Sequence, residues 1–217
     1  MPTKTLSRRD FLKVTGISVG AGVVACSGLT ALATYSPSVT LPESALGDRN
    51  ASKKILIAYA SKCGSTGEVA TAIGQTFAQN AARVDVMPLK DVTDISSYRV
   101  ILVGSAIRVG KWLPEAASFV RENLAALQRV PTAYFTVCMT MVEDTPASLA
   151  KAAGFVEPVR AVLAPAAEGY FAGKVDPERL SFIDSTMLKA KSVPVGDFRN
   201  WDKIKGWAQA TYTQICA

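Results

Sequence analysis

Short apolar runs alternate with amphipathic helical patterns along the chain from Lys53 to the C-terminus. Most of the runs are rich in β-branched residues and are bounded by charged or turn-forming residues, as strands are. The five runs read KKILIAYA, RVDVMPL, YRVILVGSA, PTAYFTVCM and AAEGYFAG. Strands that alternate with helices form βαβ units, which build a parallel sheet covered on both faces. We therefore predict an α/β fold with a doubly wound, five-stranded parallel sheet in the order 2-1-3-4-5.

The stretches between the runs have helical periodicity. They cover residues 65–81, 113–127, 145–163 and 200–215. In the first of them, Val69, Ile73 and Phe77 recur at four-residue steps and form one apolar face. Pro158 should interrupt the third helix, and Asn200 should cap the last one.

A different kind of segment precedes this domain. Arg8, Arg9 and Lys13 form a positive region, and no charged residue follows from Val14 to Pro42. A positive region before a mildly apolar stretch is typical of a targeting segment, whereas four glycines between residues 14 and 33 make a buried core helix unfavourable. The stretch SRRDFLK resembles the signal of the twin-arginine export route. This resemblance implies that a folded protein, usually one carrying a cofactor, is exported to an extracytoplasmic location.

The fate of the segment, residues 1–33, stays open between three alternatives. VVAC resembles a lipobox, so that cleavage would leave Cys26 as a lipid-bearing N-terminus, which we favour slightly. ALA at 31–33 would serve ordinary cleavage, and an uncleaved segment of about 20 residues is long enough to span a bilayer. Residues 34–52 lack apolar periodicity and are predicted to be a flexible tether. The folded domain is then 53–217.

Charge and composition exclude several classes of protein. The formal net charge is +6, and the four basic residues and one acid before Cys26 leave +3 for the rest, too little for a strongly basic nucleic-acid binder. The chain has no histidine, which rules out a Ser-His-Asp or Cys-His nucleophile and a His-ligated metal. Its four cysteines show no metal-ligand spacing, so we expect no metal site.

The loop after the first predicted strand carries the clearest site. It reads SKCGSTG, residues 61–67, and lies between a buried strand and the start of a helix. Unpaired N–H groups and the helix dipole favour an anion there, and hydroxyls of Ser61, Ser65 and Thr66 can add donors, with Lys62 adding charge. A phosphate fits this chemistry. The alternative is that Ser65 or Thr66 only caps the helix.

The same loop resembles the flavodoxin phosphate loop, [ST]-x-T-G-x-T. Ser61, Gly64 and Thr66 match it, whereas Cys63 stands where the family usually has threonine, which removes one hydroxyl donor. The stretches GSAIRVGKW, FAGKVD and GDFRNWDKIKGWA are similar to those of the branch that contains the menaquinone-dependent protoporphyrinogen oxidases. The resemblance runs from Lys53 nearly to the C-terminus and implies a flavodoxin-like fold with non-covalently bound FMN.

Two further loops should complete the FMN site on this resemblance. The loop SAIRVGKW should cover one face of the flavin ring, with Arg108 or Lys111 offsetting negative charge on the reduced flavin. Trp112 could stack on the ring, although packing in the core is favoured. The loop CMTMVED should line the other side, with Cys138 as a small buried group. The predicted FMN-binding residues are Ser61, Lys62, Cys63, Gly64, Ser65, Thr66, Ser105, Ala106, Ile107, Arg108, Val109, Gly110, Cys138, Met139 and Thr140.

These expectations describe an exported FMN-dependent redox protein, with a quinone or a membrane redox protein as its partner and no nucleic acid. Catalysis would be the chemistry of the cofactor, so no side chain is predicted to act as acid or base. Two alternatives stay open. One is a quinone-dependent dehydrogenase of the protoporphyrinogen oxidase type, and the other is a flavin-free binding or scaffold module, which Cys63 suggests.

Overall fold

A computed structural model describes residues 39–48, 50–80, 82–180, 186 and 193–216. The chain divides into two compact units, and the fold described below is that of the unit formed by 39–176 and 194–217. From the other unit, the described residues are 177–180, 186 and 193, which include the short 3-10 helix η3 (Pro177–Arg179). The predicted targeting segment, with Arg8, Arg9 and Cys26, lies outside the described residues.

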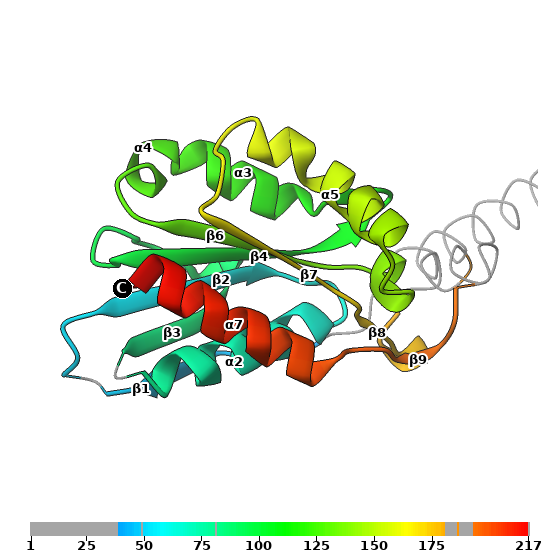
Figure 1. Ribbon diagram of the computed structural model, residues 1–217, viewed down its shortest axis with the longest axis horizontal. Coiled ribbons are helices and arrows are strands. Elements are labelled where there is room, and N and C mark those ends of the chain that lie inside the picture. The colour runs from blue at the N-terminus through cyan, green and yellow to red at the C-terminus, as the bar shows by residue number, and fades with distance from the viewer. Residues whose placement is uncertain (1–38, 49, 81, 181–185, 187–192, 217) are drawn as a thin grey trace, which may run out of the picture. The chain divides into compact units, whose positions relative to one another are not determined.

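Six strands form the main path of the central sheet, in the order β1-β3-β2-β4-β6-β7, and a short seventh strand pairs with β4 (Figure 1). The strands are β1 (Ser44–Gly47), β2 (Lys54–Ala60), β3 (Arg83–Pro88), β4 (Val100–Arg108), β5 (Lys111–Trp112), β6 (Thr132–Val137) and β7 (Ala167–Phe171). The strands β3, β2, β4, β6 and β7 are parallel, which confirms the predicted fold class and the order 2-1-3-4-5. A separate two-stranded sheet joins β8 (Lys174–Val175) to β9 (Gly196–Asp197).

The strand β1 corrects the prediction of a flexible tether over 34–52 for its residues 44–47. It pairs antiparallel with β3, with Ser44 opposite Val86. The pairing uses backbone groups of β3 that a five-stranded sheet would leave at its edge. Leu46 packs against the core, and a Cβ at Gly74 of the neighbouring helix would lie 3.2 Å from Leu46 Cδ1. Apolar packing and edge pairing therefore order residues whose sequence has no strand-like pattern.

Two helices cover one face of the sheet and three cover the other (Figure 1). The helices are α2 (Ser65–Ala78) and α7 (Trp201–Cys216) on the first face, and α3 (Pro114–Glu122), α4 (Leu124–Leu127) and α5 (Pro146–Arg160) on the second. The predicted helix 113–127 is divided at Asn123, and α5 continues past Pro158. Proline removes one N–H, but the helical bonds resume when Ala161 N donates to Glu157 O at 2.9 Å. Asn200 caps α7 as predicted, accepting from Lys203 N at 3.0 Å.

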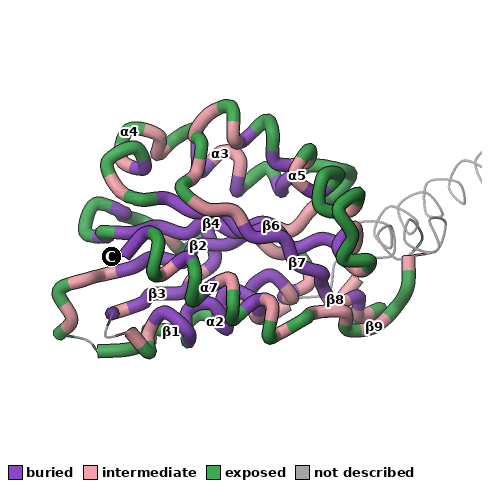
Figure 2. Tube along the Cα trace, viewed as in Figure 1, coloured by how far each residue is buried: buried purple, intermediate pink, exposed green. Residues whose placement is uncertain are grey.

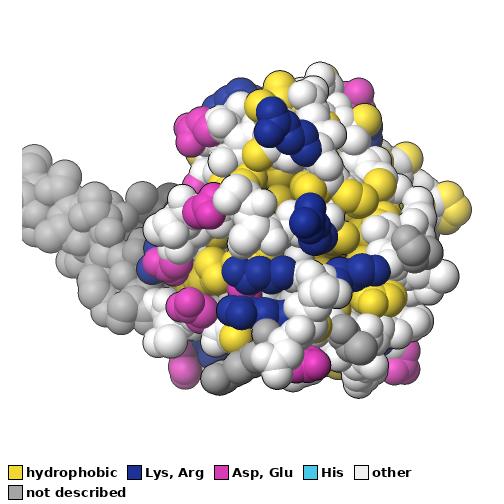
Figure 3. All heavy atoms as spheres, turned by 90° about the vertical axis from the view of Figure 1, so that its left-hand side faces the viewer, with side chains coloured by type: hydrophobic (Ala, Val, Ile, Leu, Met, Phe, Trp, Pro, Cys, Tyr) yellow, Lys and Arg dark blue, Asp and Glu magenta, His cyan; other side chains and the backbone are white. Residues whose placement is uncertain are grey.

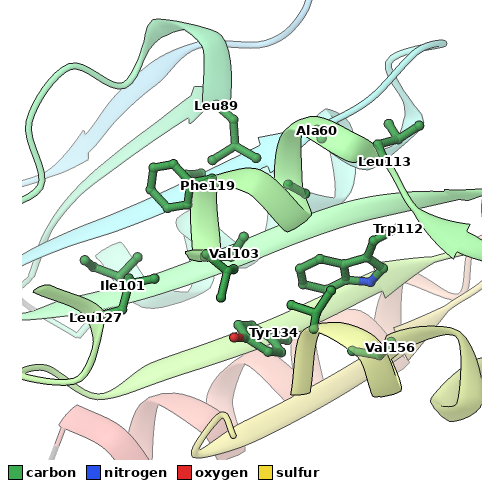
Figure 4. Packing of buried hydrophobic residues seen from close by; sticks show 14 of the residues in the cluster. Ala60, Leu89, Ile101, Val103, Trp112, Leu113, Phe119, Leu127, Tyr134 and Val156 are labelled. Atoms are coloured by element: carbon green, nitrogen blue, oxygen red, sulfur yellow. The ribbon is translucent and has the colours of Figure 1, made fainter. Parts of the chain in front are cut away.

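The core has two halves, one on each face of the sheet, and Figure 2 shows that the central strands are buried almost throughout. Alternate residues of β2 point to opposite faces, so Ile55 and Ile57 pack with α2 while Leu56 and Ala58 pack with the helices opposite. Figure 4 shows Trp112 of β5 inside the second half of the core. Core packing, the favoured alternative for this residue, is confirmed.

Candidate cofactor site

The predicted loops meet because they follow the carboxyl ends of three neighbouring strands. In the register of the sheet, Ala60 of β2 lies opposite Ser105 of β4, and Ala106 lies opposite Val137 of β6. The strands β2 and β6 therefore end within one residue of the same level at this edge, and β4 continues past them to Arg108. Ligands of doubly wound sheets bind at this edge, beside the strands where the direction of winding reverses.

The first loop is folded as a helix N-terminus with free donors. Gly64 N donates to Ser61 Oγ at 3.0 Å, which closes the turn and leaves the Ser61 hydroxyl hydrogen available to a ligand. Gly64 has a φ of 87°, a left-handed conformation that favours glycine, and α2 begins at the next residue. The first N–H groups of α2 have no partner within the helix, so they can bind an anion.

Thr66 provides a specific test of whether this loop fits a phosphate. Its side chain is fully buried, and among the described residues its Oγ1 has no hydrogen-bond partner. A buried hydroxyl without a partner destabilises a protein by about 1–3 kcal/mol. A phosphate oxygen at the N-terminus of α2 would accept this hydrogen bond. The residues of the loop therefore fit the phosphate of FMN. The alternative that Ser65 or Thr66 caps the helix is wrong, because the N-cap is Gly64 and it has no side-chain cap hydrogen bond.

Lys62 and Cys63 lie at the rim of this loop. Lys62 is exposed, and its Nζ lies 3.3 Å from Glu115 Oε1 in the first turn of α3, so the ion pair joins the loop to the next helix. Cys63 is half-buried. Among the described residues, Cys63, Cys138 and Cys216 form no disulfide.

The predicted loop 105–112 is a β-hairpin. The strand β4 continues to Arg108, a two-residue turn follows, and β5 pairs back so that Ile107 lies opposite Trp112. Val109 and Gly110 form the turn with φ values of 51° and 71°, and Val109 is 70% exposed. Positive φ at both turn residues matches the twist of the strands in a tight hairpin. It is unfavourable for a β-branched residue such as Val109.

Within this hairpin the predicted FMN-binding residues differ in what they can do. Ser105 is fully buried, donates to Ala106 O at 2.8 Å and accepts from Leu113 N at 3.0 Å. Its hydroxyl hydrogen is thus already used, and Ser105 shapes the hairpin instead of donating to a ligand. Ala106 and Ile107 are half-buried, whereas Arg108 is exposed.

The third loop lies beyond β6 and contains the short 3-10 helix η2 (Met139–Val142). Cys138 is buried, and burial raises the pKa of its thiol, in agreement with a small buried group. Met139 and Thr140 are half-buried at the site edge. The acids Glu143 and Asp144 are exposed. The helix α5 is capped by Thr145, whose Oγ1 accepts from Ser148 N at 3.1 Å.

Two segments that the predictions did not include also reach this edge. A Cβ at Gly173, just after β7, would lie 3.5 Å from Ser65 Oγ and 4.0 Å from Met139 Sδ, so this glycine lies between the first and third loops. Arg199 forms an ion pair with Glu68 in α2. In the sequence, Gly173 and Arg199 stand out only because they lie in FAGKVD and GDFRNWDKIKGWA, two of the stretches that carry the family resemblance. Nothing in the sequence indicated that Glu68 would lie at this edge.

Other surface features lie away from these loops. A groove of about 220 Å³ between residues 89–95 and α3 is lined by none of the predicted FMN-binding residues. Lysine and arginine side chains gather on the face where the parallel strands begin, opposite to the candidate site (Figure 3). Lys53, Lys54 and Arg83 stand at the amino ends of β2 and β3 on this side. Among the helices of the described residues, none is long and apolar enough to cross a bilayer.

Comparison with known families agrees with this geometry. A profile of the family described as flavodoxin domain matches residues 56–193, which is more than half of the chain. The chain belongs to the flavodoxin-domain family. Flavodoxin-fold homologues generally bind FMN and act in redox reactions.

Individual relatives of this flavodoxin domain are distant. Protoporphyrinogen IX dehydrogenase (quinone) from Leishmania major is 25% identical over 144 residues, which cover 64% of this chain and 62% of that protein. The chain therefore spans less than two thirds of the relative. A flavodoxin from the domain Archaea is 18% identical, with 76% of this chain and 99% of that chain covered and a TM-score of 0.46. For flavodoxin 1 from Bacillus cereus the identity is 18%, the coverage 58% and 89%, and the TM-score 0.42.

Proposed function

We propose that this chain is an exported redox protein that binds FMN at the carboxyl edge of its sheet and passes electrons to a quinone or a membrane redox protein. The observation that carries the proposal is the buried Thr66 hydroxyl at the N-terminus of α2, which has no hydrogen-bond partner in the part of the chain that the structure describes, in a flavodoxin-domain chain. Bound FMN would supply one- and two-electron transfer. The residues of the protein would bind and orient it.

Each loop has a separate task in this proposal. Donors from Ser61, Thr66 and the backbone at the start of α2 hold the phosphate. The hairpin turn at Val109 and Gly110 and the segment around Met139 flank the ring. The hydroxyl of Ser105 and the indole of Trp112 keep the hairpin in place, since both are bonded inside the protein.

Titration of the purified domain with FMN and with riboflavin tests the proposal. Tight FMN binding with at least about tenfold weaker riboflavin binding is expected, because riboflavin lacks the phosphate. A protein that binds neither compound contradicts the proposal and favours a flavin-free scaffold. Equal affinity for both compounds also contradicts the assignment of the phosphate loop.

A second candidate function follows from the match to the Leishmania major protein, whose name gives a protoporphyrinogen IX dehydrogenase that uses a quinone. An FMN-loaded chain of this type would oxidise protoporphyrinogen IX and reduce an added quinone. Quinone reduction that depends on protoporphyrinogen IX would support this candidate. Its absence, with FMN still reducible by a chemical donor, would leave the electron-carrier function.

A further inference from the structure

A tyrosine ring lies directly beneath the first turn of α2. Tyr59, the penultimate residue of β2, is fully buried. A Cβ at Gly67 would lie 2.6 Å from Tyr59 Oη and 2.7 Å from its Cε2 and Cζ atoms, so the backbone of Gly67 rests on the hydroxyl end of the ring. Any side chain at position 67 would displace the ring or the helix. Gly67 is therefore the point of close approach between β2 and α2.

This turn holds the donors of the proposed phosphate site. Glu68 N donates to Gly64 O at 3.1 Å, so the helical bonds of α2 begin there and the N–H groups of residues 65–67 precede them. Those three N–H groups and the Thr66 hydroxyl can bind one anion together only if the turn keeps its position. The ring of Tyr59 sets this position from below.

The hydroxyl end of Tyr59 is held by the N-terminal strap, which we define as residues 39–47. Tyr59 Oη donates to Pro42 O at 2.6 Å. Burial raises the pKa of the Tyr59 hydroxyl, so the group stays protonated and keeps donating. A buried hydroxyl that loses its partner destabilises its surroundings. Pro42 therefore fixes the same end of the ring that touches Gly67.

The strap is itself bound along β3 and α2 (Figure 1). Its residues 44–47 form β1, which pairs with β3. Leu41 and Leu46 pack against the half of the core that α2 covers. A Cβ at Gly47 would lie 3.3 Å from the Cβ of Ala78, the last residue of α2. The strap therefore contacts the helix near its C-terminal end and, through Tyr59, reaches its first turn.

We propose that Tyr59 is a positioning residue through which the N-terminal strap fixes the first turn of α2 for recognition of the phosphate of FMN. This inference rests on the proposed function. By linkage the coupling is reciprocal, so a phosphate bound at the turn must stabilise the strap by the same factor by which the strap raises the affinity for that phosphate. Riboflavin, which lacks the phosphate, should be affected less.

Fluorescence titration of the full-length wild type, Tyr59→Phe and Tyr212→Phe with FMN and with riboflavin tests the role of Tyr59. Tyr59→Phe keeps the ring but removes its bond to the strap, and should lower the FMN-to-riboflavin preference about fivefold, the order expected for one hydrogen bond. Tyr212→Phe is the matched control, because its hydroxyl donates to Asn80 O at 2.8 Å, beyond the other end of α2. It should keep the preference within about twofold of wild type.

Equal losses for both ligands in Tyr59→Phe, or an unchanged preference, would overturn the inference. An equally large loss of preference in Tyr212→Phe would overturn it too, because the effect would then not be specific to the first turn.

Hydrogen exchange of the wild-type protein tests the strap without any substitution, so it applies even if Tyr59→Phe does not fold. The amides of β1 should exchange about fivefold more slowly with FMN bound, and the slowing with riboflavin should be smaller. The amides of α4, on the opposite face of the sheet, report general stabilisation. A slowing in β1 that is no larger than in α4, or that is equal for both ligands, would overturn the inference.

Failure of the proposed function gives a different result. Wild-type protein that does not bind FMN contradicts the proposed function itself. Wild-type protein that prefers FMN over riboflavin, with no change of preference in Tyr59→Phe and no protection of β1, contradicts only the role of Tyr59 and the strap.

Discussion

The indole of Trp112 donates to the hydroxyl of Thr136 at 2.9 Å in the buried core, which ties the hairpin of the candidate site to β6. The Trp112 ring also meets Tyr134 edge-on, with centroids 5.0 Å apart (Figure 4). Tyr134 and Thr136 are two residues apart on one strand and point to the same face of the sheet. The hairpin is therefore held from beneath by a polar and an aromatic contact.

Replacing Trp112 with Phe should lower the free energy of unfolding by about 1–3 kcal/mol, since Thr136 Oγ1 loses its buried donor and ring volume is lost. The double variant Trp112→Phe with Thr136→Val removes both polar partners and should recover part of this loss. Urea denaturation of the four proteins of the cycle measures the coupling. A strictly additive cycle would contradict a stabilising bond between these two side chains.

Thr66→Val should affect stability and FMN binding in opposite directions. Valine has nearly the shape of threonine, so the change removes a buried hydroxyl without a partner and should stabilise the ligand-free protein by about 1 kcal/mol. The same change removes a phosphate donor and should weaken FMN binding about tenfold, or roughly 1.4 kcal/mol. Thr71→Val is the matched control on the same helix, because the Thr71 hydroxyl is bonded to Gly67 O. Weaker FMN binding in both variants would contradict a specific role of Thr66.

Val109→Asn should stabilise the ligand-free protein by about 1 kcal/mol. A β-branched residue is strained at the φ of 51° that Val109 adopts, whereas asparagine tolerates the left-handed region. An increase in the melting temperature should report the gain. Val195→Asn, which changes another valine that is 63% exposed but has no positive φ, should leave it unchanged. An equal increase in both variants would show that the gain comes from replacing an exposed apolar side chain and not from relief of backbone strain.

Glu168 predicts a pH dependence of stability. Burial alone raises its pKa, but hydrogen bonds from Arg160, both at 2.8 Å, and from Tyr170 lower it below the ordinary value. Because the folded pKa lies below the unfolded one, Glu168 stabilises the protein above the unfolded value of 4.5, and this contribution is lost as the pH falls through the folded pKa.

Glu168→Gln should therefore be less stable than wild type by about 1–3 kcal/mol at pH 7, and the difference should shrink as the solution is acidified below about pH 4.5. Urea denaturation at several pH values measures this. Glu143→Gln, on an exposed side chain, is the control and should stay near wild type. If the difference in the free energy of unfolding between wild type and Glu168→Gln is as large in acid as at pH 7, the loss comes from packing and not from the charge of Glu168.

The proposed export gives a prediction about Arg8 and Arg9. Their joint replacement by lysine should stop export and leave the domain inside the cell with FMN bound, because the twin-arginine route moves folded proteins. Lys4→Arg, which leaves the arginine pair intact, should export normally. Cell fractionation with flavin measured in each fraction distinguishes the outcomes. Export of the double lysine variant would contradict the signal, and a flavin-free protein retained inside would contradict loading before export.

The order of the parallel strands and the position of the loop 61–67 at the carboxyl edge of the sheet could be predicted from the sequence alone. The alternation of strands and helices and the small hydroxyl residues after the first strand are local signals, and the strand order follows from the doubly wound fold class that they indicate. The segment 105–112 was predicted as a loop at the carboxyl edge of the sheet, and its pairing as a hairpin was not visible in the sequence. The sequence indicated three hydroxyl donors in the first loop and one at Ser105. Only the structure shows that Ser105 is bonded within the hairpin, whereas the Thr66 hydroxyl has no partner within residues 39–216 as far as they are described.

The remaining features depend on residues that meet only after folding. Glu68 and Arg199 are 131 residues apart, and neither residue is marked by its sequence neighbours as a partner of the other. The strand β1 has no strand-like pattern, and its order comes from the exposed edge of β3 and from the packing of Leu46. Local propensity cannot encode such contacts, because their energy comes from burial and pairing between distant segments. The sequence determined the fold class and where the candidate loop lies, whereas the tertiary structure decided which hydroxyls are bonded among the described residues and which distant side chains pair, as Arg199 does with Glu68.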